Sequence, residues 1–208
     1  MNNVLIAIVA VVALACGGLI YHQLNQPEMP ENALFYKQAR DVDPFELTDH
    51  QGQAFTNEQL KGKWSWLFFG YTSCPDVCPT TLQELNFVYD ELKAISDTQV
   101  LLVSVDPQRD TVEKLSQYIA YFNQEFVALR GDHSALYPFA RNLGLMYAIA
   151  DDGRHDSYLV DHSASIVLVN PKGKIAAIFK PQQALGKLPV VSGDNVVADF
   201  ARVVKLTD

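Results

Sequence analysis

Two cysteines placed close together are the residues of this sequence best suited to metal or redox chemistry. Cys74 and Cys78 lie four positions apart in FFGYTSCPDVCPTTL, and each is followed by a proline. Because proline lacks an N–H group, it is accommodated at the start of a helix and not in its middle. We therefore expect the two thiols near a helix N-terminus, where the partial positive charge favours thiolate over thiol.

A cysteine pair with this spacing allows three kinds of chemistry. A purely structural disulfide would close a very small loop and would remove little entropy from the unfolded chain. A redox dithiol is the second possibility, although the thioredoxin-type dithiol has two residues between its cysteines and this pair has three. A metal site is the third, because side chains four residues apart in a helical turn point the same way.

The identity of a bound metal would depend on a third ligand. Zinc sites in proteins have four ligands, or three ligands and a water molecule, and two cysteines are too few. Copper(I) is satisfied by two thiolates and an imidazole, and soft thiolate ligands select it. The sequence therefore favours copper if a suitable histidine lies close to the cysteines.

The chain has five histidines, and His162 is the best candidate for this third ligand. It precedes a predicted buried strand that we expect beside the strand leading into the cysteines. Asp161 could orient its imidazole or cap the loop. His50 and His133 are expected to be solvated. The other two histidines are His22, which borders an apolar N-terminal segment, and His155, in a polar loop.

Strands alternate with helices from residue 44 onward, judged from apolar runs and from apolar side chains repeating every three or four residues. This order predicts a mostly parallel sheet covered on both faces, in an α/β sandwich of the thioredoxin-like, peroxiredoxin type. Asp110, Asp132 and Asp194 are predicted helix N-caps. The expected elements are hairpin 45–56, strand 64–71, a helix entered at 77–80, strand 99–106, helix 112–122, strand 126–129, helix 133–143, hairpin 164–179 and a final helix after 194.

The N-terminus differs from the rest of the chain. Residues 4–20 are apolar or glycine, a run of 17 residues at the lower limit of a membrane-spanning helix. We expect residues 1–24 to be a membrane anchor or signal segment, 25–43 a polar tether and 44–208 the folded domain. A lipidated Cys16 and simple cleavage are the alternatives to a retained helix, and all three place the domain outside the cytoplasm.

The overall charge excludes one class of partner. Lys and Arg number 16 against 24 Asp and Glu, which gives a net charge of -8 for 208 residues. Nucleic-acid binding requires clustered cations that displace counterions from phosphates. We therefore expect no nucleic acid among the partners of this protein.

Three segments together resemble the Sco/SenC family from about residue 45 to the end: FFGYTSCPDVCPTTL, VSVDPQRDT and VDHSASIVLVNPKG. These are thioredoxin-fold, membrane-anchored copper proteins that assist cytochrome c oxidase assembly. The resemblance implies copper ligation by Cys74, Cys78 and His162, with the domain on the periplasmic side of a bacterial inner membrane. Asp106 and Asp110 are expected to be structural, in a turn and a helix cap.

The resemblance implies a metallochaperone that takes copper from a donor protein or small copper complex. It would deliver this copper to the dinuclear copper centre of cytochrome c oxidase subunit II. The alternative is a thiol-disulfide reductase that keeps the copper-site cysteines of that subunit reduced, with Cys74 and Cys78 as its catalytic dithiol. A copper or redox sensor is a third hypothesis. A further sulfur, that of Met146, is expected in the core.

Overall fold

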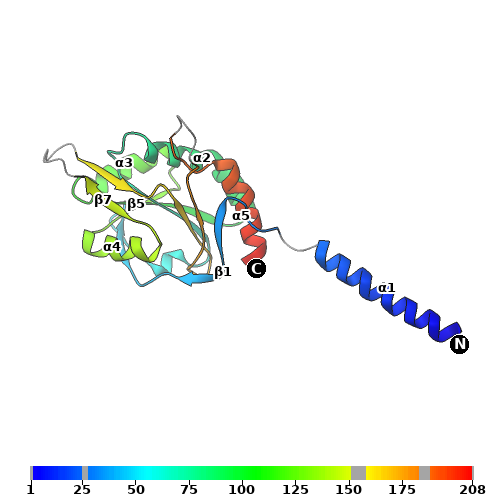
Figure 1. Ribbon diagram of the computed structural model, residues 1–208. Coiled ribbons are helices and arrows are strands. Elements are labelled where there is room, and N and C mark those ends of the chain that lie inside the picture. Colours follow the sequence, from blue (N-terminus) through cyan, green and yellow to red (C-terminus); the bar gives the residue numbers. More distant parts are fainter. Residues whose placement is uncertain (1, 25–27, 151–157, 183–187, 208) are drawn as a thin grey trace.

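A mixed sheet of eight strands, in the order β1-β10-β9-β4-β5-β6-β2-β3, forms the centre of the domain. It is seen in a computed structural model that describes residues 2–24, 28–150, 158–182 and 188–207 (Figure 1). The strands of this sheet are β1 Ala33–Asp41, β2 Glu46–Asp49, β3 Ala54–Thr56, β4 Trp64–Gly70, β5 Thr98–Ser104, β6 Val127–Arg130, β9 Ile166–Val169 and β10 Lys174–Phe179.

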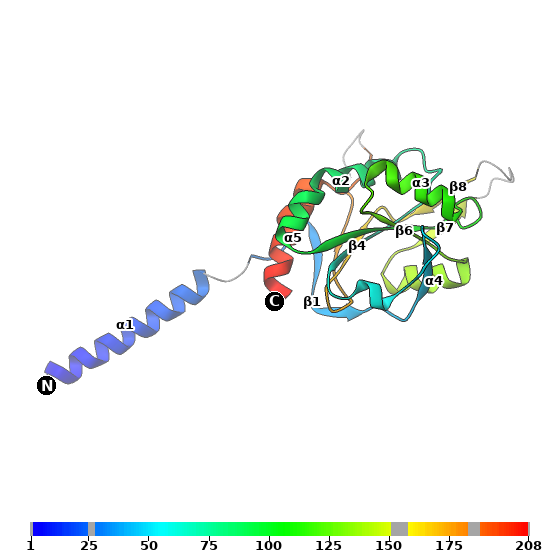
Figure 2. The ribbon, with the colours of Figure 1, turned by 180° about the vertical axis from the view of Figure 1, so that it is seen from behind.

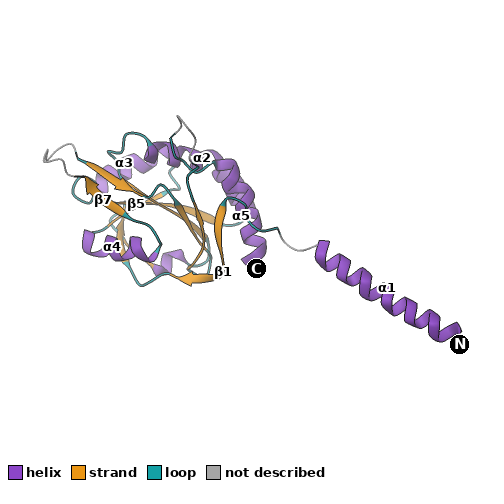
Figure 3. Ribbon diagram, viewed as in Figure 1, coloured by secondary structure: helices purple, strands orange, loops and turns teal. Residues whose placement is uncertain are grey.

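Helices cover both faces of this sheet, and a separate two-stranded sheet stands at one end (Figure 3). In Figures 1 and 2, α2, α3 and α5 lie on one side of the large sheet and α4 lies on the other. The remaining elements are α1 Asn2–Leu24, the 3-10 helix Asn57–Leu60, α2 Val77–Ile95, α3 Val112–Phe122, α4 His133–Asn142, β7 Tyr147–Ala150, β8 Leu159–His162 and α5 Gly193–Thr207.

Strand β4 is the central strand of the core, and all seven of its residues are buried. It runs parallel to β5 and antiparallel to β9, with Phe68 opposite both Leu102 and Ile166. Successive side chains of a strand point to opposite faces. Accordingly, Trp66 packs on Phe200 of α5 at a ring separation of 5.0 Å, and Phe69 lies 6.0 Å from Phe139 of α4. The aromatic run therefore joins both helical layers to the sheet.

The predicted thioredoxin-like α/β class is confirmed, but the prediction of a mostly parallel sheet was wrong. Only the β4–β5 and β5–β6 pairs are parallel among the described pairings of the large sheet. The two hairpins, β2–β3 and β9–β10, contribute antiparallel strands, and so does β1. A hairpin returns the chain to its neighbour directly, whereas a parallel neighbour requires a helical crossover.

The tether predicted for residues 25–43 was wrong for residues 33–41, which form β1. This strand pairs antiparallel with β10, with Ala33 opposite Phe179 and Asp41 opposite Lys174. An edge strand needs apolar contacts on one face only, so its composition can be as polar as that of a linker. Its partner lies more than a hundred residues away, which no local pattern reveals.

Two of the three predicted helix caps were wrong. The side chain of Thr111, not Asp110, accepts the cap hydrogen bond of α3, from the Lys114 amide at 3.2 Å. Asp132 does occupy the N-cap position of α4, although its side chain makes no cap hydrogen bond. Asp194 lies inside the first turn of α5, which begins one residue earlier. Asp110 is instead fully buried, and its carboxylate accepts hydrogen bonds from Thr72 and Ser104.

Helix α1 lies apart from the domain (Figures 1 and 2). The stretch Leu5–His22 is long and apolar enough to cross a membrane, and none of it is buried against other parts of the structure. A secretory signal sequence has the same properties. Helix α1 is therefore a candidate membrane anchor.

Candidate metal centre

The two cysteines lie where β4 runs into α2, as predicted. β4 ends at Gly70 and α2 begins at Val77, so Cys74 belongs to the connecting loop and Cys78 to the first helical turn. The Cys74 amide donates to the Tyr71 carbonyl at 3.2 Å, and the Cys78 amide donates to the Cys74 sulfur at 3.4 Å. The helix start therefore turns one of its free N–H groups toward a sulfur.

Gly70 gives the second cysteine the room that it occupies. A Cβ atom at position 70 would lie 3.0 Å from Cys78 Sγ and 3.1 Å from side-chain atoms of Leu102 and Phe68. These separations are shorter than ordinary carbon contacts, so a larger residue would displace the sulfur or its neighbours. The absence of a side chain at Gly70 therefore leaves the space in which the buried thiol of Cys78 packs.

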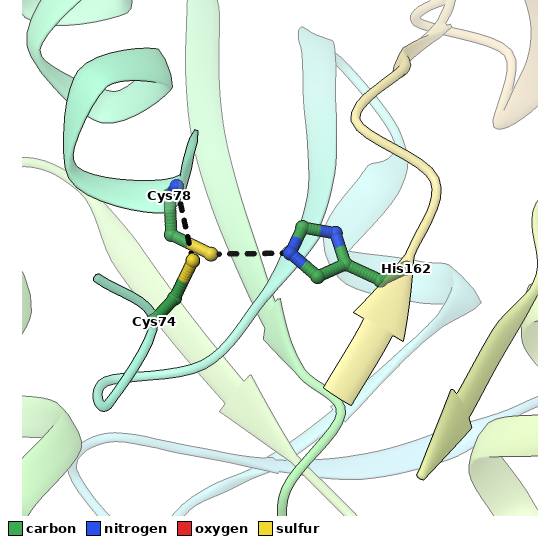
Figure 4. Close-up of side chains that lie close together, drawn as sticks. All are labelled: Cys74, Cys78 and His162. Carbon is green, nitrogen blue, oxygen red and sulfur yellow. Dashed lines mark hydrogen bonds between the residues drawn. The ribbon is translucent and has the colours of Figure 1, made fainter. Parts of the chain in front are cut away.

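His162 reaches the cysteines from β8 (Figure 4). Its Nε2 atom lies 3.2 Å from Cys78 Sγ, and one ligand atom from each of Cys74, Cys78 and His162 lies within 4.8 Å of the other two. Both cysteines are free thiols, with Cys74 partly exposed and Cys78 buried. The structure therefore brings together all three residues that were predicted as metal ligands.

The imidazole ring of His162 is held by the next residue of the chain and by two aromatic rings. Its Nδ1 atom lies 3.3 Å from the Ser163 carbonyl oxygen, and Phe68 and Tyr71 contact the ring edge to face at centroid distances of 5.8 and 6.0 Å. When the proton is on Nδ1, the lone pair of Nε2 faces the sulfurs and can bind a metal ion; when it is on Nε2, the ring donates to a cysteine sulfur instead. Among the described contacts, the Ser163 carbonyl has the orienting role that was suggested for Asp161. The side chain of Asp161 is exposed.

The two thiols are electrostatically unequal. A hydrogen bond from Cys78 lowers the pKa of Cys74 to about 4, and bonds from His162 and from the Cys78 and Asp76 amides act in the same direction against burial. The same bond to Cys74, and then burial, raise the pKa of Cys78. The pair therefore holds one proton at neutral pH, with a thiolate at the partly exposed Cys74 and a thiol at the buried Cys78.

A surface pocket opens beside Cys74, and its rim is largely apolar. Pro75 of the cysteine loop and Val77 at the start of α2 line it on one side, and Leu159 and Pro189 line it as well. Leu159 is 54% exposed. Two exposed carboxylates, Asp76 and Asp161, line the same pocket, so a partner that approaches the sulfurs would meet both apolar and acidic side chains.

Sequence reasoning placed three other residues incorrectly. His50 and His133 are half-buried and hydrogen-bonded within the domain, to the Ala128 amide at 3.2 Å and to the Tyr147 hydroxyl at 2.9 Å. Each therefore helps to join elements of the fold. Met146 is 79% exposed, just before β7, and is not in the core. His155 lies outside the described residues.

Tyr71 is a site residue that sequence reasoning missed. Its ring contacts His162, and its hydroxyl accepts a hydrogen bond from the Val160 amide at 3.3 Å. The only signal in the sequence was an aromatic residue directly after the buried run WSWLFFG. Such a residue is more simply explained as core, so its contact with β8 could not be predicted.

Known proteins are similar to this chain in sequence and in fold. The SCO1/SenC family model matches residues 36–189. The human mitochondrial protein SCO1 homolog is 33% identical over 148 residues, which cover 70% of this chain and 49% of that protein. The crystal structure of Arabidopsis thaliana ScoI with copper bound has a TM-score of 0.68 at 28% identity and covers 79% of this chain and 98% of that chain.

A second structure shows the fold alone, because its sequence is only 23% identical. This is BsSco, a member of the Sco family of cytochrome c oxidase assembly proteins in which a disulfide switch was identified. Its TM-score is 0.60, and the match covers 83% of this chain and 98% of that chain.

The fold and the site together define a class of protein. It is a thioredoxin-like α/β domain with two cysteines at the junction of its first core strand and the following helix, and a histidine that reaches them from β8. The chain belongs to the SCO1/SenC family.

Proposed function

We propose that this protein binds copper through Cys74, Cys78 and His162 and delivers it to the dinuclear copper centre of cytochrome c oxidase subunit II. One observation carries the proposal: two cysteine sulfurs and the imidazole nitrogen of His162, which lies 84 positions after Cys78, converge within 4.8 Å. Copper-bound ScoI of Arabidopsis thaliana and the oxidase-assembly role of the family to which BsSco belongs support it.

The donor set suits copper as a cargo that must be both held and released. Two thiolate sulfurs select the soft cuprous ion, and the imidazole adds the nitrogen that the cupric ion prefers. Copper binding would displace the remaining proton of the cysteine pair, because only thiolates are strong ligands. The exposed Cys74 is the sulfur that an incoming ligand can reach, so ligand exchange would begin there, while Cys78 and His162 retain the ion.

The location that we propose follows from α1. This helix would retain the protein in a bacterial inner membrane, with the domain on the periplasmic side. There it would meet a donor of copper and the copper domain of subunit II. The apolar rim beside Cys74 is the surface that would face both partners.

A second function is favoured by the asymmetry of the two thiols. The Cys74 thiolate could attack a disulfide of the acceptor and release one of its sulfurs as a thiolate. Cys78, after losing its proton, would then attack the mixed disulfide and leave the acceptor fully reduced and its own pair oxidised. A low pKa at the exposed cysteine and a second thiol beside it are the two requirements of this reaction. His162 has no necessary role in it.

The histidine therefore separates the two functions. His162→Ala removes the only nitrogen ligand of the proposed set and leaves both thiols able to form a disulfide. If copper delivery is the function, cells carrying His162→Ala lose oxidase activity at limiting copper, and added copper restores part of it.

Cys74→Ser and Cys78→Ser are the matched controls, because they impair both functions. Oxidase activity in the His162→Ala strain that stays near the wild-type level at limiting copper, with loss in both cysteine variants, would transfer the assignment to the reductase.

A further inference from the structure

The loop between β5 and α3 buries two carboxylates close to the site. Asp106 and Asp110 are 2% and 0% exposed, and the side chain of Arg109 between them is 20% exposed. A buried charge is costly unless it is paired and hydrogen-bonded. Both groups must therefore be stabilised by partners, and each carboxylate has one such partner on a segment that leads to the cysteines or to the histidine.

Asp110 holds the cysteine loop. Its carboxylate accepts hydrogen bonds from the Thr72 amide at 3.1 Å and the Thr72 hydroxyl at 2.5 Å. It also accepts one from the Ser104 hydroxyl at the end of β5, at 2.7 Å. Thr72 lies two residues before Cys74. The carboxylate therefore joins the loop to the adjacent parallel strand.

Asp106 holds the segment that leads to the histidine. The Tyr158 hydroxyl donates to one oxygen of this carboxylate at 2.5 Å, and Arg109 is paired with the other oxygen. The Arg109 guanidinium lies over the Tyr158 ring at 3.7 Å and near the Tyr71 ring at 5.6 Å. Burial, and then the bond to Asp106, raise the pKa of Tyr158 to about 12, so this hydroxyl stays a donor at neutral pH.

These contacts matter because β8 is not part of the large sheet. β7 and β8 form a separate two-stranded sheet, and such a hairpin is marginally stable without other packing. The distance of His162 from the cysteines therefore depends on what ties β8 to the domain. Tyr158 immediately precedes this strand. Within the strand, the Val160 amide donates a hydrogen bond to the hydroxyl of Tyr71, which follows β4.

We propose that residues 106–110 are a positioning segment with two separate arms. The arm of Asp106, Arg109 and Tyr158 sets the position of His162, and the arm of Asp110 and Thr72 sets the position of the cysteine pair. Neither carboxylate is a ligand. This inference rests on the proposed function only in taking His162 as a copper ligand.

The first test removes one hydroxyl from the histidine arm. Tyr158→Phe keeps the ring that stacks on Arg109 and deletes the bond to Asp106. The matched control is Tyr89→Phe, which also removes a buried hydroxyl and its hydrogen bond, here to the carbonyl of Thr98 at the start of β5, at 3.2 Å. In the metal-free full-length protein in detergent, Tyr158→Phe shifts or broadens the imidazole nitrogen NMR signals of His162, and Tyr89→Phe leaves them unchanged.

The second measurement uses copper itself. Outer groups that orient a metal ligand change affinity by about 10- to 100-fold. Tyr158→Phe therefore weakens copper(II) binding by about 10-fold or more and alters the sulfur-to-copper absorption band. It leaves the reduction potential of the Cys74–Cys78 pair unchanged. Thr72→Val, which removes a bond to Asp110, changes that potential and leaves the metal-free His162 signals as they are.

Each outcome decides the inference. His162 signals and copper(II) affinity at wild-type values in Tyr158→Phe overturn it. Equal changes of both sites in both variants, together with a lower melting temperature, also overturn it, because they describe a general loss of stability. Wild-type protein that binds no copper, while Tyr158→Phe still moves the His162 signals, contradicts the proposed function and leaves the positioning segment standing.

Discussion

At the scale of residues, the site depends on two cysteines with different environments. Cys74 lies in a loop and is partly exposed, and Cys78 lies in the first turn of α2 and is buried. The hydrogen bond between them makes Cys74 the acceptor and Cys78 the donor. Cys74 is therefore the reactive sulfur, whether it meets a metal ion or a disulfide.

This difference predicts the pH dependence of alkylation at Cys74. A lowered pKa means that the thiolate persists above that value, so the rate of reaction with iodoacetamide stays nearly constant from pH 8 down to about pH 5. It then falls as the pH drops through about 4. Peptide mapping by mass spectrometry separates the label on Cys74 from that on Cys16. A rate that already falls between pH 9 and pH 8 would contradict this assignment.

Cys78→Ala tests the cause of the low pKa. This variant removes the hydrogen bond that lowers the pKa of Cys74 most, so the pKa rises toward its ordinary value. At pH 6 the rate of alkylation then falls by about 10-fold, because fewer molecules carry a thiolate. Cys78→Ser keeps a hydroxyl donor, so its rate of alkylation at Cys74 is expected to lie between those of the wild type and Cys78→Ala. Equal rates in wild type and Cys78→Ala would assign the effect to His162 and the backbone amides instead.

At the scale of elements, the chain before β1 is held by α5. The buried carboxylate of Asp199 accepts hydrogen bonds from the backbone amides of Glu31, Asn32 and Ala33 at 2.9, 2.6 and 2.9 Å. Arg202, one helical turn later, pairs with Asp199 at 3.1 Å. Arg202 also pairs with Glu28 at 3.1 Å, so the connection between α1 and the domain is attached to the fold from residue 28 onward.

Replacing Asp199 should release this connection. Asp199→Asn substitutes an amide nitrogen for one acceptor oxygen and so removes the acceptor of at least one of these backbone amides. Hydrogen bonds to a charged group are worth about 1.5–3 kcal/mol, so the free energy of unfolding in urea is expected to fall by about 2 kcal/mol. Hydrogen exchange at residues 31–33 should accelerate at the same time.

Asp194→Asn is the control for this prediction. Asp194 is an exposed acidic residue in the first turn of the same helix, where the dipole contributes well under about 1 kcal/mol. Its replacement should leave exchange at residues 31–33 unchanged. If Asp199→Asn also leaves that exchange unchanged, β1 is held by its pairing with β10 alone.

At the scale of the whole molecule, α1 and the acidic domain belong to different environments. Helix α1 is apolar and stands apart from the domain (Figure 1). The net charge of the chain is -8, which favours solubility of the rest. This arrangement fits a domain held at a membrane surface by one N-terminal segment.

This arrangement predicts where the protein is found in a Gram-negative host. The full chain should sediment with membranes and resist extraction at high pH, and protease added to spheroplasts should digest the domain. Cys16→Ser should behave like the wild type if α1 is a retained helix, and should leave the membrane if lipid on Cys16 is the anchor. Protection in spheroplasts with digestion only after lysis would show the opposite orientation.

Much of the fold and one part of the site were determined by local sequence. The buried run ending at Gly70, the two Cys-Pro pairs and the apolar repeat of α2 predict a strand, a helix start and two thiols between them. These signals lie within about twenty residues and reflect side-chain burial and proline sterics, which act over one turn or one strand. The α/β class could be predicted for the same reason.

The tertiary structure decided what depends on distant partners. Residues 33–41 form a strand because they pair with β10. Asp110 is a buried acceptor because Thr72 and Ser104 both donate hydrogen bonds to it. His162 was named from its place before β9, yet its position beside Cys78 comes from the β7–β8 hairpin and its contacts with other segments. Local propensity contains no information about such contacts, because their free energy arises only when segments far apart in the chain exclude water together.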